Sequence, residues 1–153
     1  MEYTRRKWGE MLAWGATTWW EMWHHDQSLC HGWSAAPTYY LPVQVLGVTP
    51  LKPGFKRLRI APDPFDLEWA GGTIPTPQGP VEVSWEVSER FDLSVCLPSG
   101  CAAEVVLPDA GISADRIRVN NKKSLPDGVK SAKPVDGKPA FVIEKAGRWT
   151  FSY

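Results

Sequence analysis

A carboxylate among tryptophans is the residue pattern in this sequence with the clearest chemical potential. Glu21 lies close to Trp19, Trp20 and Trp23 along the chain. Aromatic faces commonly stack on the apolar faces of sugar rings, and an ionised carboxylate can take a proton from water. The pattern therefore supports two interpretations of Glu21: a general base beside a bound sugar, or a helix-capping or exposed glutamate among core tryptophans.

A second group of reactive side chains follows directly and consists of His24, His25, Cys30 and His31. Zinc sites usually combine ligand pairs such as CxxC or HxxxH, and the spacing HHxxxxCH fits neither pattern. Nothing in the sequence around Cys30 resembles an activating base with a third orienting group, which a thiol nucleophile requires. We therefore expect no metal, no other cofactor and no cysteine nucleophile.

Tryptophan is abundant in this chain, with nine residues. Aromatic residues at helical spacing are more often core than ligand platforms, so Trp8 and Trp14 are expected to be buried. Trp33, in a predicted loop, stays open between the two roles. Three others occur in strand-like patterns and are expected in the core of a β domain: Trp69, Trp85 and Trp149.

Helical periodicity dominates the first part of the chain, up to about position 48. A loop is expected over residues 25–33, and helices over 4–12, 17–24 and 34–47. Pro37 and Pro42 must lie near the start of the third helix or kink it. Three short helices cannot bury this much aromatic surface alone, so they must pack on another part of a larger structure.

After Pro50 the apolar residues alternate with polar ones, and proline and glycine separate short runs. This pattern is typical of antiparallel strands in an all-β domain. Seven runs are expected as strands: 55–60, 81–87, 91–97, 103–107, 116–119, 140–144 and 148–153. They predict a β-sandwich, in which residues 71–80 form a long turn-rich loop.

The turn Pro98-Ser99-Gly100 separates two of these runs, and we expect it to join them as a hairpin. Cys96 and Cys101 flank the turn, so they could lie across the hairpin from each other. A disulfide in an oxidising compartment and two buried free thiols explain these residues equally well.

Composition excludes several classes of protein. The 153 residues carry 17 basic and 17 acidic side chains, and 43% of them are hydrophobic. Zero net charge, with scattered lysines and arginines, provides no footprint for phosphate backbones, so no nucleic-acid partner is expected. No apolar run reaches the ~18 residues of a membrane span. Glu10 and Trp14 interrupt the apolar stretch that a secretory signal would need, and nothing indicates the cellular compartment.

Several strings in this sequence resemble the C-terminal part of bacterial α-L-rhamnosidases of glycoside hydrolase family 78. The resemblance covers positions 5 to 110 closely and the rest loosely. Its most specific strings are GATTWWEMW over residues 15–23 and CHGWSAAPT over residues 30–38. Further matching strings are WGEML at 8–12, LGV at 46–48, PGF at 53–55, IAP at 60–62, the segment 79–85, and LPSG at 97–100.

The resemblance implies a mainly β fold, an antiparallel β-sandwich preceded by short α-helical segments from the end of an (α/α)6 barrel. Residues 1–48 would be the last barrel helices, and residues 49–153 the sandwich. Enzymes of this family hydrolyse the glycosidic bond with inversion at the anomeric carbon, using one carboxylic acid as general acid and one carboxylate as general base. By resemblance Glu21 is the general base. The residues expected to bind substrate are His31, Trp20, Trp23 and Trp33.

The general acid of the family belongs to an earlier barrel segment, so we expect the chain to be inactive alone. Its partners would be a rhamnose-containing glycoside or polysaccharide and either the remainder of the barrel or a second copy of this chain. The alternative is a non-catalytic carbohydrate-binding or structural β-sandwich, whose helices dock another polypeptide. Whether the chain is an enzyme therefore stays open at this point.

Overall fold

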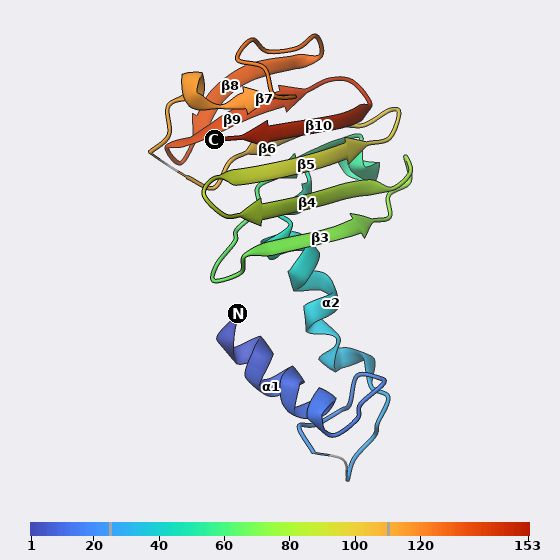
Figure 1. The fold of residues 1–153 in the computed structure, drawn as a ribbon. Coiled ribbons are helices and arrows are strands. Elements are labelled where there is room, and N and C mark those ends of the chain that lie inside the picture. Colours follow the sequence, from blue (N-terminus) through green and yellow to red (C-terminus); the bar gives the residue numbers. More distant parts are fainter. Residues whose placement is uncertain (25, 110) are drawn as a thin grey trace. The chain divides into compact units, whose positions relative to one another are not determined.

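The chain forms two compact units, residues 1–41 and 42–153 (Figure 1). The computed structural model describes residues 1–24, 26–109 and 111–153. Among these described residues, no helix combines the length and the apolarity that crossing a bilayer requires. Each unit has its own secondary structure, helical in the first and β in the second, as the change of periodicity predicts.

The first unit begins with helix α1, Glu2–Ala13, which buries Met11. The predicted helix over 4–12 is therefore confirmed and extends to both sides. The predicted helix over 34–47 is present in pieces: a 3-10 turn Gly32–Ser34, helix α2 over Ala36–Tyr40, and a π-helical turn over Leu41–Val45. Pro37 lies in the first turn of α2, and Pro42 falls in the π turn because it has no N–H for a regular helical hydrogen bond.

The predicted helix over 17–24 is wrong, because this segment has no helical turn in the described residues. Its backbone bonds instead with the following loop: the Glu21 N–H donates to the Ser28 carbonyl at 2.8 Å, and the His31 N–H donates to the Trp19 carbonyl at 2.6 Å. Threonine and tryptophan lose side-chain freedom in a helix, which favours this alternative. His25 lies outside the described residues.

The second unit is a sandwich of two five-stranded sheets within the described residues. The first sheet has the order β1-β2-β6-β9-β8, with strands Val48–Pro50, Arg57–Ile60, Ala102–Val106, Lys138–Ile143 and Val129–Val135. The second has the order β3-β4-β5-β10-β7, with strands Trp69–Ile74, Val81–Val87, Phe91–Leu97, Gly147–Ser152 and Arg118–Val119. Two 3-10 turns, Pro53–Phe55 and Ala114–Arg116, connect strands. The predicted β-sandwich is confirmed.

The core lies between the sheets and follows the predicted alternation. Residues of β5 alternate between buried and half-buried positions along its whole length. Trp85 and Trp149 are buried as predicted, and the Trp85 indole N–H donates to the Val45 carbonyl at 2.8 Å. This bond fastens the π-helical turn to the sandwich core.

Two sequence predictions for the sandwich are wrong. The runs 91–97 and 103–107 do not form a hairpin: β5 pairs with β4 and β10, whereas β6 pairs with β2 and β9 in the other sheet. Both edges of β5 are therefore already occupied, and the turn at residues 98–100 carries the chain across the sandwich. The expected loop over 71–80 is also partly strand, because β3 extends to Ile74.

Two tryptophans that were predicted to be buried, Trp69 and Trp14, are exposed in the structure. Trp69 is 70% exposed because it lies on the outer face of β3, and Trp14 is 52% exposed at the C-terminal end of α1. The sequence does not distinguish the inner face of a strand from its outer face when aromatic residues occur on both. Only the packing of the sheets decides which tryptophan is inside.

All three cysteines are free thiols, so the hairpin disulfide is absent. The Cys101 thiol is buried and contacts the Phe55 carbonyl at 3.3 Å, and desolvation raises the pKa of this thiol. Because the thiolate is the reactive form, burial and the raised pKa both slow its modification. We expect Ellman's reagent at pH 8 to label exposed Cys30 first, and Cys101 only on unfolding. The variant Cys101→Ser identifies the slow phase, and a single reactive thiol in denaturant without reductant would contradict this expectation.

Candidate functional site

Glu21 and His31 lie side by side in the first unit. His31 Nδ1 is 4.0 Å from Glu21 Oε2, and the two side chains are 42% and 33% exposed, respectively. This distance is longer than a hydrogen bond, so the two side chains are neighbours that do not bond to each other. Neither side chain uses its hydrogen-bonding capacity on the other, and both remain accessible to a ligand.

The loop backbone brings these two residues together. Hydrogen bonds from Glu21 N to Ser28 O and from His31 N to Trp19 O hold the two segments against each other. The Ser28 N–H also donates to Glu21 Oε2 at 3.3 Å. Because this donor and the imidazole both approach Oε2, they orient the carboxylate and leave Oε1 without a hydrogen-bond partner among the described residues.

Ser34 anchors the loop through hydrogen bonds. No role was predicted for this residue from the sequence. Its side chain is buried, and Oγ lies 2.6 Å from the Trp20 carbonyl and 2.9 Å from the His31 carbonyl. The Trp8 indole N–H donates to the Ser34 carbonyl at 3.0 Å, which ties helix α1 to the same point. The sequence feature that could have indicated a role for Ser34 is its hydroxyl within the otherwise apolar run from Gly32 to Pro37.

The predicted aromatic residues have different surroundings. Trp33 is 62% exposed, and its ring centre lies 6.1 Å from that of His31 in an edge-to-face arrangement. Trp23 is half-buried and packs edge-on against Trp8, with ring centres 4.7 Å apart. Trp20 is 5% exposed and stacks on Trp14. Trp33 is therefore the predicted aromatic residue with a free face beside the Glu21–His31 pair.

The described residues contain no cluster of side chains that could bind a metal ion. Within 1–24, 26–109 and 111–153, no three His, Cys, Asp or Glu side chains are arranged to hold an ion. His24 pairs with Asp26, and Cys30 is exposed. His25, the fourth member of the HHxxxxCH string, lies outside the described residues.

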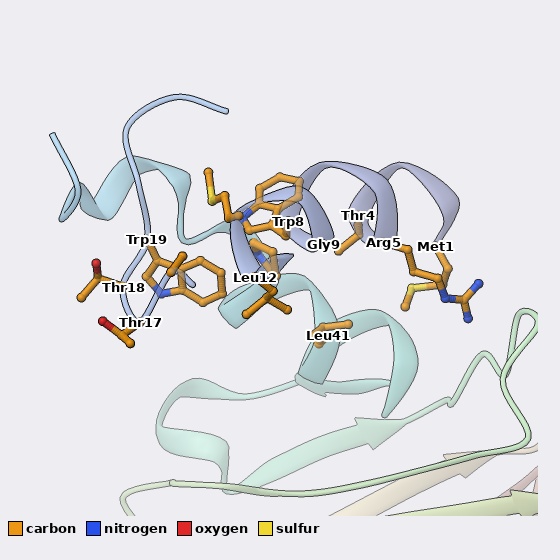
Figure 2. Close-up of a pocket in the computed structure, with 13 residues that line it drawn as sticks. Met1, Thr4, Arg5, Trp8, Gly9, Leu12, Thr17, Thr18, Trp19 and Leu41 are labelled. Atoms are coloured by element: carbon orange, nitrogen blue, oxygen red, sulfur yellow. The ribbon is translucent and has the colours of Figure 1, made fainter. Parts of the chain in front are cut away.

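An apolar hollow of about 600 Å³ lies beside α1 in the first unit. Its lining includes Trp8, Leu12, Trp19 and Leu41, whose side chains Figure 2 shows around one opening. Leu12 is 71% exposed and Leu41 is 40% exposed, so apolar side chains of this helix and its neighbours remain uncovered. As predicted from the shortness of the helices, this unit does not bury its own apolar surface.

Comparisons with known proteins agree on one family. A family model described as the bacterial alpha-L-rhamnosidase C-terminal domain matches residues 47–122. A curated alpha-L-rhamnosidase from an Alteromonas species is 38% identical over 107 residues, which are 61% of this chain and 12% of that protein. One from Formosa agariphila is 31% identical over 138 residues, covering 80% of this chain and 15% of that protein.

Comparison with solved structures shows that the fold is shared as well. The GH78 family rhamnosidase of Bacillus sp. GL1 is 38% identical, with a TM-score of 0.64 over 71% of this chain and 13% of that one. A Streptomyces avermitilis alpha-L-rhamnosidase, solved with L-rhamnose, has a TM-score of 0.80 at 24% identity and covers 95% of this chain and 14% of that one. The chain thus spans only 12% and 15% of the length of the curated relatives that it matches.

Proposed function

Because the chain belongs to the bacterial α-L-rhamnosidase family as its C-terminal portion, we propose that it supplies half of a catalytic site for hydrolysing terminal α-L-rhamnosides with inversion. Glu21 is the general base, and His31 binds a sugar hydroxyl. Trp23 and Trp33 contribute to the aromatic wall. The observation that carries this proposal is the 4.0 Å approach of Glu21 and His31 in an accessible loop.

The geometry of the Glu21 carboxylate suits a general base. In an inverting glycosidase the base removes a proton from the water that attacks the anomeric carbon, on the face opposite the leaving group. Glu21 Oε2 is held by the Ser28 N–H and lies near His31, so Oε1 is available for that water.

The acid that protonates the leaving oxygen must come from elsewhere in a complete barrel. Inverting carboxyl pairs are separated by roughly 6.5–9.5 Å, which leaves room for sugar and water. By family resemblance the acid belongs to an earlier barrel segment. The uncovered apolar side chains at Leu12 and Leu41 support the same arrangement, because the preceding helices of a longer polypeptide would pack into their hollow.

A chimeric enzyme tests this function directly. The segment of the Bacillus sp. GL1 rhamnosidase that matches this chain is replaced by the chain itself, and turnover of an aryl α-L-rhamnoside is compared with that of the isolated chain. We expect no turnover by the isolated chain, and turnover by the chimera with β-rhamnose as the first product by NMR. A folded but inactive chimera would contradict the proposal, as would turnover by the isolated chain that Glu21→Gln abolishes.

A further inference from the structure

The outer face of the second sheet carries a row of small side chains across four strands. The strand register aligns Gly71 of β3 with Ser84 of β4, Ser84 with Ser94 of β5, and Ser94 with Thr150 of β10. Figure 1 shows these four strands as neighbours. Because adjacent strands lie about 4.8 Å apart, the row is about 14 Å long. These four residues form the floor of a surface trough, which is long enough for a short oligosaccharide.

The trough has walls of larger side chains. On one side the register aligns Trp69, Glu86 and Asp92, and on the other it aligns Glu82 with Cys96 and Cys96 with Arg148. A hollow of about 450 Å³ lies here, lined by residues of β3, β4, β5 and β10 together with Asn121. Trp69, at 70% exposure, is the most exposed tryptophan described and borders this hollow.

Ser152 offers a polar contact within the hollow. Two polar side chains are buried among the described residues, Ser34 and Ser152. The Ser34 hydroxyl is satisfied by backbone carbonyls, whereas the Ser152 hydroxyl lines the hollow, bonds to no described residue and is reached by solvent. A ligand hydroxyl in the hollow can therefore form a hydrogen bond with Ser152 in place of water.

The charged residues that line the hollow are both carboxylates, Glu86 and Asp92, and they disfavour an anionic ligand. Arg148 pairs with Glu82 at 2.7 Å and donates to Ser94 Oγ at 3.2 Å, and Arg90 pairs with Asp92 at 2.7 Å. These pairs leave Glu86 as the wall carboxylate without an ion pair among the described residues. A carboxylate accepts hydrogen bonds from sugar hydroxyls and repels the carboxylate of a uronic acid.

We propose that this outer face of the sandwich is a second carbohydrate-binding site, which takes a neutral oligosaccharide. One sugar ring stacks on Trp69, and its neighbours lie along the trough with hydroxyls bonded to Glu86 and Ser152. The site lies wholly in the second unit, whereas Glu21 and His31 belong to the first. It therefore does not depend on the catalytic role proposed for that pair, and it would hold a polymer rather than cleave it.

Tryptophan fluorescence and calorimetric titration of the whole chain test the site. The probes are a neutral rhamno-oligosaccharide, a neutral gluco-oligosaccharide and an oligogalacturonate. We expect at least one neutral probe to bind, and Trp69→Ala to weaken it by about tenfold or more through loss of the stacking surface. The matched control is Trp14→Ala, which removes another exposed tryptophan that belongs to neither proposed site and should leave this binding unchanged.

Two further variants separate a trough from a lone aromatic contact. Gly71→Val fills the floor, and it should weaken binding without unfolding the sheet because its Cβ would lie 3.4 Å from the Ser84 Cβ. Glu86→Gln should improve binding of the oligogalacturonate relative to the neutral probes. Thermal unfolding of each variant confirms that the sandwich is intact. The proposal is overturned if neither neutral probe binds, or if Trp69→Ala binds them as the parent does; loss of activity at Glu21 would leave it untouched.

Discussion

Alanine in place of Gly47 is expected to lower the free energy of unfolding of the sandwich by about 3 kcal/mol or more. Gly47 has φ +72, and a Cβ there would lie 2.0 Å from the backbone carbon of Ala61. The Gly47 carbonyl also accepts a hydrogen bond from the Ala61 N–H at 3.0 Å, so the two backbones cannot separate without losing it. Backbone strain and a backbone clash therefore act together at the entrance to β1.

Gly54→Ala is the matched control. Gly54 has a similar φ of +68, but its nearest neighbour to an added Cβ is Gln78 Nε2 at 4.0 Å. This variant should lose only the conformational cost, about 1 kcal/mol. Urea unfolding followed by far-UV circular dichroism measures both variants. Equal losses at the two positions would show that the approach of Ala61 does not matter.

Glu21→Gln is expected to reduce kcat of the chimeric rhamnosidase by about 10²–10⁴-fold, the usual contribution of a general base. The amide keeps an oxygen that can accept the Ser28 N–H, which now bonds to Glu21 Oε2 at 3.3 Å, so the loop should stay in place. The amide cannot take a proton from water. The loss should therefore fall on kcat, with KM close to that of the parent enzyme.

Azide distinguishes the loss of a base from a merely misplaced loop. As an anion it attacks the anomeric carbon without giving up a proton, so it should restore turnover in Glu21→Gln and form β-rhamnosyl azide. The control is Glu10→Gln on helix α1, where the carboxylate pairs with Lys7 and is not assigned to the site. Activity of Glu21→Gln at the parent level, or a loss that azide does not rescue, would remove Glu21 from the role of base.

Short strings in the sequence were enough to propose the residues of the candidate site, but not its geometry. Glu21 and His31 were identified by family resemblance, and the structure places them together. The helix expected around Glu21 is absent, because the hydrogen bonds of this segment go to residues 28–31 instead. A helical Glu21 would have been positioned by its own segment, whereas the observed one is positioned by the loop that carries His31.

The sequence by itself determined the division into a helical part and a β part, and the positions of most strands. Alternation within runs such as 81–87 and 91–97 is local, because each strand buries every second residue wherever it pairs. The tertiary structure alone decided which strands became neighbours, that β6 joined the opposite sheet from β5, and that Trp69 faced outward while Trp85 faced the core. The reason is that pairing depends on which strand edges and sheet faces the rest of the chain leaves free.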